Sequence, residues 1–178
     1  MPSLTIEHYG SIINQSEFKN EKFKFFIETG TNAGFTVNNM LSHFTEIHSI
    51  ELSEEYYKSA CEKFKTNKNV KLHFGDSSVV LKDIIHEFND NAVFFLDGHW
   101  SGGDTAKGDK DCPLLEELET IVNDFNHKAL IIIDDYRLFG TKSNEDWTDI
   151  TNDNIKNIIQ KRMVSISDYN DRLIISLK

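Results

Sequence analysis

The sequence predicts an α/β fold in which a mostly parallel sheet is covered by helices on both faces. Short apolar segments alternate with longer amphipathic segments along most of the 178 residues, which is the pattern of successive β–α units. Several of these segments are apolar without interruption, as expected for parallel strands that are buried on both faces. The last two apolar segments flank a short polar turn, which predicts an antiparallel hairpin at the end of the chain.

Seven strands and five main helices follow from this alternation. The apolar segments predict strands at 23–27, 47–51, 70–74, 92–96 and 129–133, and the terminal hairpin comprises 163–166 and 173–177 around a turn at 168–171. The amphipathic segments predict helices at 34–43, 53–66, 77–88, 113–124 and 152–161, because their apolar residues recur at helical spacing.

Two of these helices carry recognisable start signals. Ser53 can cap helix 53–66, and the acidic residues that follow it interact favourably with the helix dipole. Pro113 suits the first turn of helix 113–124, because its missing N–H would have no helical partner there, and Asp111 or Cys112 precedes it.

Length and composition indicate one globular domain with a substantial core. The net charge of −10 argues against binding to a nucleic-acid backbone or an anionic membrane, since both attract basic surfaces. Cys61 and Cys112 belong to no Cys/His cluster with zinc spacing, so a reducing compartment, the cytoplasm, is expected. Neither a signal peptide nor an apolar run approaching 18 residues is found.

The ends of the first three predicted strands carry residues suited to a nucleoside ligand, because ligands of open parallel sheets bind beyond the carboxyl ends of the strands. In the run 28–34, Gly30 allows a sharp turn and Gly34 lets the next helix start close to the sheet. Glu51 closes the second strand and can accept both hydroxyls of a ribose, and Asp76 closes the third and can accept an adenine amino group. Each feature alone also fits a plain turn, a surface acid or a helix cap, but their order at successive strand ends favours a ligand.

These segments resemble the cofactor motifs of class I S-adenosylmethionine-dependent methyltransferases, over residues 23–136. E-T-G-T-N-A-G resembles the first motif with Asn32 in place of its middle glycine, and I-H-S-I-E-L-S and H-F-G-D-S resemble the second and third. The resemblance implies a Rossmann-like, seven-stranded sheet of order 3-2-1-4-5-7-6, with the methyltransferase domain at 23–178 after a helix or lid segment at 1–22. It implies S-adenosylmethionine as the cofactor, bound by Glu28, Thr29, Gly30, Thr31, Asn32, Gly34, Glu51, Leu52, Gly75, Asp76, Ser77 and Asp97. In that arrangement Glu28 and Gly30 lie beside the methionine part, Glu51 on the ribose and Asp76 on the adenine.

Acidic residues also follow the fourth and fifth strands. Asp97 comes directly after 92–96, and Asp134 and Asp135 come directly after 129–133. If these strand ends are neighbours, three carboxylates converge, and like charges packed together are costly unless something compensates them. A divalent cation with oxygen ligands, Mg²⁺ or else Mn²⁺ or Ca²⁺, would compensate them. The alternative is that one or two of these acids cap helices or face water.

This region resembles metal-dependent O-methyltransferases of the catechol type and of the macrolide-deoxysugar (macrocin/mycinamicin) type. The resemblance implies that Asp97, Asp134 and Asp135 hold Mg²⁺, which grips two substrate hydroxyls and lowers the pKa of the attacking one. His99 is the expected base, although those families place the base three residues after the metal aspartate, and Asp97 is the alternative. The expected acceptor-pocket residues are Trp100, Asp104, Tyr136, Arg137 and Trp147.

The sequence therefore predicts an enzyme that methylates a hydroxyl of a sugar or glycan. The preference for a sugar rests on L-D-G-H-W-S-G-G and I-D-D-Y. A catechol-type O-methyltransferase is the first alternative. A nucleotide-cofactor oxidoreductase is disfavoured because the Gly30 turn lacks the third glycine of G-x-G-x-x-G, and a non-catalytic binding domain is disfavoured by the intact set of acids. The expected partner is a small molecule or glycan, without nucleic acid or membrane, in a homodimer or a longer glycan-modifying polypeptide.

Overall fold

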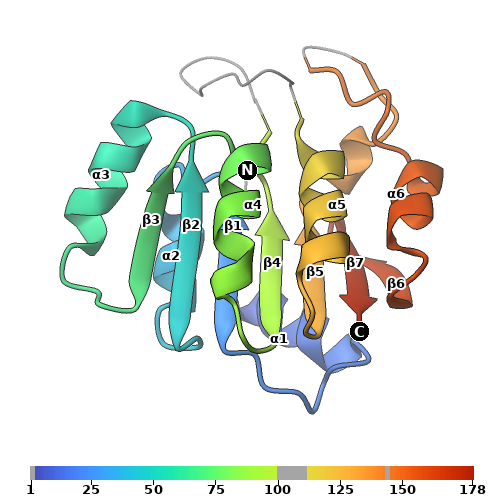
Figure 1. Ribbon diagram of the computed structural model, residues 1–178, viewed down its shortest axis with the longest axis horizontal. Helices are drawn as coiled ribbons and strands as arrows, with labels where there is room; N and C mark the ends of the chain where they lie inside the picture. Colours follow the sequence, from blue (N-terminus) through green and yellow to red (C-terminus); the bar gives the residue numbers. More distant parts are fainter. Residues whose placement is uncertain (1–2, 100–111, 143–144) are drawn as a thin grey trace.

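The computed structural model describes residues 3–99, 112–142 and 145–178, which form a seven-stranded sheet with helices on both faces (Figure 1). The strands are β1 (Phe25–Thr29), β2 (Glu46–Glu51), β3 (Val70–Phe74), β4 (Ala92–Leu96), β5 (Ala129–Ile133), β6 (Met163–Tyr169) and β7 (Arg172–Leu177). The α-helices are α1 (Ile6–Gln15), α2 (Phe35–Met40), α3 (Glu54–Phe64), α4 (Ser77–Ile84), α5 (Leu114–Asp124) and α6 (Asn152–Ile159), and two short 3₁₀ helices are η1 (Ile85–Glu87) and η2 (Tyr136–Leu138).

The strand order β3-β2-β1-β4-β5-β7-β6 confirms the predicted sheet. Strands β1 to β5 pair in parallel, and β7 is antiparallel to both β5 and β6. The predicted hairpin is confirmed, and its turn residues Asn170 and Asp171 have φ angles of 49° and 62°, as a two-residue turn between twisted strands requires. Strand β6 runs three residues further than predicted, because pairing continues to Tyr169 opposite Arg172.

Strands β3, β4 and β5 have the predicted bounds, whereas β1 begins and ends two residues later than predicted. Pairing of β1 starts where Phe25 lies opposite Glu46 and Ala92, and it continues to Thr29 opposite Leu96. Glu28, which was expected to end the strand, therefore lies inside it. Its side chain therefore accepts a hydrogen bond from Ser49 on β2 instead of lying in the loop.

Alternate residues of the central strands point into two apolar cores, one on each face of the sheet. Phe94 and Leu96 face one core with residues of α4, α5 and α6, and Val93 and Phe95 face the other with residues of α1, α2 and α3. Figure 1 shows α4 and α5 in front of the sheet and α2 behind it. This two-sided burial explains why the central strands are apolar throughout.

The N-terminal segment lies against the α2 face of the sheet. Thr5 caps α1, Ile12 is buried, and the backbone of Leu4 accepts a hydrogen bond from Asn39 Nδ2 at 3.0 Å and donates one to Thr36 Oγ1 at 3.3 Å. The lid role predicted for residues 1–22 stays a prediction. None of the described helices combines the length and the apolar composition needed to cross a bilayer.

Candidate active site

The loop between β1 and α2 turns under tight steric limits. Gly30 has a φ angle of 84°, its N–H donates to Ile50 O at 2.9 Å, and a Cβ atom on it would lie 2.5 Å from the carbonyl oxygen of Asp97. Gly34 also has a positive φ, and a Cβ atom there would lie 2.7 Å from the Phe64 ring. Glycine is therefore required at both positions, and Gly30 places the loop directly against the segment that follows β4.

Glu51 lies at the end of β2 with its carboxylate turned toward this loop. One oxygen accepts the Asn32 N–H at 2.7 Å and the other accepts the Ser53 N–H at 2.8 Å. Asn32 takes the left-handed conformation, with φ of 47°, which asparagine tolerates better than most residues. Because a carboxylate can accept about four hydrogen bonds, Glu51 keeps acceptor capacity for a further pair of donors.

Asp76 lies at the end of β3 and caps α4. Its Oδ1 accepts the Ser78 N–H at 2.9 Å and the Ser78 hydroxyl at 2.6 Å. The helix-cap interpretation of this residue is thus realised, and its predicted contact with adenine stays a prediction. Gly75 precedes it with a φ of 142°.

The remaining predicted cofactor residues lie around Gly30, Glu51 and Asp76. Thr31 Oγ1 is 2.6 Å from Ser49 Oγ, and Thr29 Oγ1 accepts the Asp97 N–H at 3.2 Å. Ser77 is buried beside Gly98, and Leu52 is half-buried next to Glu51. The fold therefore gathers the predicted set at one edge of the sheet.

Glu28 is fully buried beneath the loop, 1% exposed, and accepts a hydrogen bond from Ser49 Oγ at 2.6 Å. Burial raises its pKa to about 8, although hydrogen bonds from Ser49 and Thr36 act in the opposite direction. A carboxyl with this pKa is largely protonated at neutral pH. Its position places a potential negative charge directly under the predicted methionine site.

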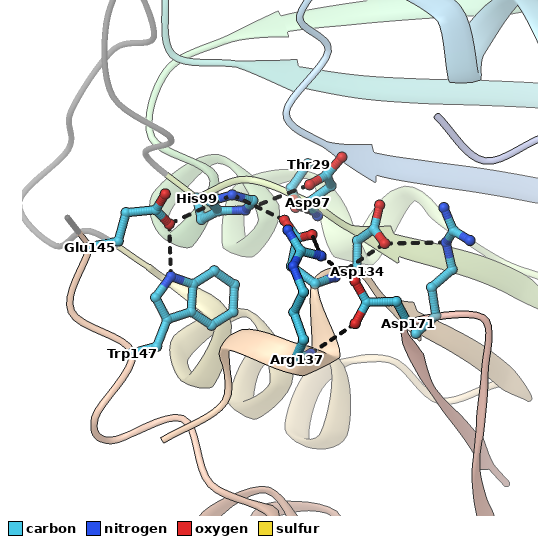
Figure 2. A network of polar contacts seen from close by, with 10 residues as sticks. Thr29, Asp97, His99, Asp134, Arg137, Glu145, Trp147 and Asp171 are labelled. Atoms are coloured by element: carbon cyan, nitrogen blue, oxygen red, sulfur yellow. Dashed lines mark hydrogen bonds and ion pairs between the residues drawn. The ribbon is translucent and has the colours of Figure 1, made fainter. Parts of the chain in front are cut away.

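Beyond β4 and β5, Asp97, His99 and Asp135 lie close together. Figure 2 shows His99 beside Asp97. His99 Nδ1 is 3.6 Å from Asp97 Oδ1, and its Nε2 is 3.3 Å from Asp135 Oδ2 and 3.7 Å from Glu145 Oε2. The side chains of His99 and Asp135 are only 4% and 2% exposed. The imidazole thus lies between the buried carboxylate of Asp135 and the partly buried carboxylates of Asp97 and Glu145.

Asp134 lies beside this group but faces elsewhere. Its Oδ1 is 3.3 Å from Nε of the buried Arg172 and accepts the Asp135 N–H at 3.1 Å. Burial raises the Asp134 pKa to about 6 while Arg172 opposes that shift. The predicted trio of carboxylates is therefore brought together, but His99 rather than Asp134 lies between the other two.

Burial is the largest cause of the pKa shifts of Asp97 and His99. Burial raises the pKa of Asp97 well above its ordinary value, and Asp134, Asp135 and Glu28 raise it further by repulsion. Burial lowers the pKa of His99, whereas the charge of Asp135 opposes that shift. Negative charge here is expensive without a positive partner.

The predicted acceptor residues have mixed outcomes. Arg137 Nη1 donates to Asp135 Oδ1 at 2.5 Å and to Asp171, and its side chain is about half exposed. Tyr136 accepts a hydrogen bond from Asn152 Nδ2 at 2.9 Å. Trp147 is buried and its ring lies 5.0 Å from that of His99. Trp100 and Asp104 lie outside the described residues.

Sequence reasoning missed two acids at this site. Glu117 on α5 is 1% exposed, burial raises its pKa to about 7, and its Oε1 has no hydrogen-bond partner among the described residues. Glu145 accepts the Trp147 Nε1–H at 2.8 Å. The signal for Glu117 was present, because it lies on the apolar face that Leu118 and Ile121 share. No local pattern marked Glu145.

A hollow of about 200 Å³, counted with its opening to solvent, lies beside Asp97, His99 and Glu117. It is lined by Leu96, Asp97, Gly98, His99, Cys112, Pro113, Leu114, Glu117, Ile133 and Trp147. Two carboxyl groups and an imidazole on an otherwise mainly apolar wall suit the binding and deprotonation of a small polar group.

Similarity to known proteins lies in the fold. No protein-family model and no curated protein matches the chain. Among solved structures, a putative caffeoyl-CoA O-methyltransferase from Staphylococcus aureus matches with a TM-score of 0.64 and 16% identity, over 99% of this chain and 85% of that one. SMU.1697c, a putative methyltransferase from Streptococcus mutans in complex with SAH, matches with a TM-score of 0.59 and 15% identity, over 99% and 100%. An rRNA methylase from Streptococcus thermophilus matches with a TM-score of 0.58 and 11% identity, over 100% and 98%. The chain therefore has the Rossmann-like fold of class I methyltransferases.

Proposed function

We propose that this chain is a metal-dependent O-methyltransferase that transfers a methyl group from S-adenosylmethionine to a hydroxyl of a sugar or glycan. The observation that carries the proposal is the gathering of acids at one sheet edge. Glu51 ends β2 and Asp76 follows β3, whereas Asp97 and Asp135 follow the neighbouring strands β4 and β5. The first pair suits a nucleoside, and the second suits a cation and a reacting hydroxyl.

The residues present fit the cofactor. Glu51 keeps free acceptor capacity at each oxygen while backbone N–H groups hold it in place, which suits a ribose diol. Burial raises the pKa of both Glu28 and Asp97, and a cationic ligand would favour their charged forms. When bound, S-adenosylmethionine supplies a methyl group on a positively charged sulfur.

The residues present also fit a divalent metal, because Asp97 Oδ1, His99 Nε2 and Asp135 Oδ2 are buried without hydrogen-bond partners among the described residues. A metal there lowers the pKa of a coordinated hydroxyl. The second carboxylate oxygen of Asp97, or the imidazole of His99 where it does not bind the metal, would accept the proton that the hydroxyl loses. Alignment of the hydroxyl with the methyl donor supplies most of the remaining rate enhancement.

The choice of acceptor follows from charge. The chain carries a net charge of −10 and a buried acidic cluster beside the hollow, so phosphate-rich acceptors are repelled. This disfavours RNA, although an rRNA methylase is among the structures with this fold. Uncharged sugar hydroxyls donate hydrogen bonds to carboxylates and meet no such repulsion. A catechol-type acceptor is the second candidate, favoured by the likeness to a putative caffeoyl-CoA O-methyltransferase.

Two measurements test the proposal. Calorimetry with S-adenosylhomocysteine should give one site with a dissociation constant in the micromolar range or tighter, and absence of binding would overturn the cofactor assignment. Transfer of labelled methyl groups is then measured against a panel of neutral sugars and glycans and a matched panel of catechols. Label appearing in the catechols alone would replace the sugar assignment with the second candidate.

A further inference from the structure

We propose that Asp97, His99 and Asp135 form a mixed nitrogen–oxygen metal site that prefers a first-row transition-metal ion such as Mn²⁺, Co²⁺ or Zn²⁺ over Mg²⁺ or Ca²⁺. The metal's role in methyl transfer rests on the proposed function. The binding of the metal does not depend on it. It assigns His99 as a ligand, in place of the base that the sequence predicts.

Geometry brings the three donors to a common point. One ligand atom from each residue lies within 4.8 Å of those from the other two. His99 Nε2 is 3.3 Å from Asp135 Oδ2, whereas the nitrogen 3.6 Å from Asp97 Oδ1 is Nδ1. Ligands of one small divalent ion lie about 3–3.5 Å apart when each bond is about 2.1 Å, so the side chains must shift for one nitrogen of His99 to share an ion with both carboxylates.

The donor atoms lack other partners. Asp97 Oδ1, His99 Nε2 and Asp135 Oδ2 are all buried and form no hydrogen bond with any described residue. Each such atom destabilises the folded protein when it is left unsatisfied. The side chains of His99 and Asp135 are also more than nine-tenths buried, so bulk water does not satisfy them. A bound cation would satisfy all three atoms at once.

The surroundings orient the ligands as outer partners of metal sites commonly do. Asp135 takes the left-handed conformation with φ of 57°, and Arg137 donates to its Oδ1, which leaves Oδ2 turned toward His99. Trp147 donates to Glu145 and lies edge-on to the His99 ring. Glu145, 3.7 Å from His99 Nε2, is a third acid within reach of the site.

Asp134 is the predicted ligand that this arrangement leaves out. Its Oδ1 is engaged by Arg172 and by the backbone of Asp135. Its Oδ2 is buried without a hydrogen-bond partner among the described residues, but Asp134 is not part of the group whose ligand atoms lie within 4.8 Å of one another. Replacing a carboxylate by an imidazole changes metal preference, because Mg²⁺ and Ca²⁺ favour oxygen ligands throughout, whereas imidazole suits transition metals.

The site is tested on metal-free protein, titrated separately with Mn²⁺, Co²⁺ and Mg²⁺ by calorimetry, with Co²⁺ also followed by visible absorption. One equivalent of Mn²⁺ or Co²⁺ should bind at least tenfold more tightly than Mg²⁺. His99→Ala should weaken Co²⁺ binding at least tenfold and alter the absorption bands. His43→Ala, which removes an exposed histidine, should change neither, and circular dichroism checks that each variant is folded.

Three results would overturn the inference. Equal affinity for Mg²⁺ and Mn²⁺ that His99→Ala leaves unchanged would indicate an oxygen-only site. A larger loss of Co²⁺ affinity in Asp134→Asn than in His99→Ala would restore the predicted trio. Absence of metal binding, together with a protonated His99 in NMR titration, would show that the imidazolium itself neutralises the acids. Binding of S-adenosylhomocysteine, measured on the same samples, separates each of these failures from a failure of the proposed function.

Discussion

At the ends of β2 and β3, the carboxylates of Glu51 and Asp76 accept hydrogen bonds from backbone N–H groups. At the ends of β4 and β5, Asp97 and Asp135 instead leave buried oxygens without partners around His99. The first region is complete within the protein, whereas the second has buried polar atoms without hydrogen-bond partners among the described residues. This difference is what we expect if the predicted cofactor side is formed in advance and the proposed reaction side depends on a positive partner.

The two regions are in physical contact. The turn at Gly30 lies against the backbone of Asp97, and Thr29 accepts the Asp97 N–H. Repulsion from Glu28, beneath the cofactor loop, is one of the causes that raise the pKa of Asp97. A substitution in one region can therefore alter the other region. Variants in each region separate local effects from shared ones.

The largest effect is expected for Asp97→Asn. This change keeps the shape of the side chain but removes a proposed metal ligand and one candidate base, so methyl transfer to the acceptor found in the glycan panel should fall about 10³-fold. Affinity for S-adenosylhomocysteine, measured by calorimetry, should stay within about fivefold, because the backbone contacts of Asp97 are unchanged. Asp83→Asn removes an exposed carboxylate and serves as the matched control. Turnover within tenfold of the wild type would contradict the division between the two regions.

Gly30→Ala should break the contact between the regions. The added Cβ would lie 2.5 Å from the Asp97 carbonyl oxygen at a φ of 84°, and such a clash together with backbone strain should lower the free energy of unfolding by about 2–4 kcal/mol. Gly10→Ala is the control, since nothing lies within 4 Å of its Cβ position in α1. That change should raise stability by about 0.5–1 kcal/mol. Urea unfolding measures both, and equal stabilities would refute the steric argument.

Sequence patterns predicted the fold closely because burial on both faces leaves a strong signal. The continuous apolar runs at β4 and β5 have the bounds that were predicted. Convergence of acids from neighbouring strands was also predictable, since carboxyl ends of parallel strands share one edge. Strand β1 was displaced by two residues because Phe23 and Lys24 precede it in a run that looks equally extended.

The partners within the site could not be predicted. Asp134 and Asp135 are adjacent in sequence, yet one faces Arg172 on β7 and the other faces His99. That choice depends on a contact 38 residues away and on the left-handed backbone of Asp135, and neither leaves a local signal. Burial of Glu117, by contrast, was available from its place on the apolar face of α5.

The pH dependence of stability should distinguish Glu28 from its surface counterparts. Its folded-state pKa is raised from 4.5 to about 8, so the folded protein keeps a proton that the unfolded chain has lost. Its contribution to stability is therefore fully present below pH 4.5 and is lost as the pH rises through about 8. The slope approaches about 1.4 kcal/mol per pH unit in that window.

Glu28→Gln should remove this contribution while keeping an oxygen that accepts the Ser49 hydroxyl. Between pH 6 and 8 the variant should gain about 2 kcal/mol relative to the wild type, measured by urea unfolding at each pH. Glu55→Gln, at an exposed position, should show no such trend. Parallel pH curves for Glu28→Gln and the wild type would mean that Glu28 is charged throughout, and that the cofactor side carries an unpaired charge as well.

The smallest effect is expected for Glu51→Gln, on the side that is complete without a ligand. The amide keeps one accepting oxygen but removes the other and the charge, so affinity for S-adenosylhomocysteine should fall about tenfold. Metal affinity should be unchanged, because Glu51 lies at the end of β2 and contacts Asn32 and Ser53 rather than the cluster around His99. Calorimetry with both ligands on one preparation compares the two regions directly. Loss of Mn²⁺ affinity in this variant would show that the predicted cofactor region and the acidic cluster form one coupled site. Metal affinity would then depend on the conformation of the Gly30 loop.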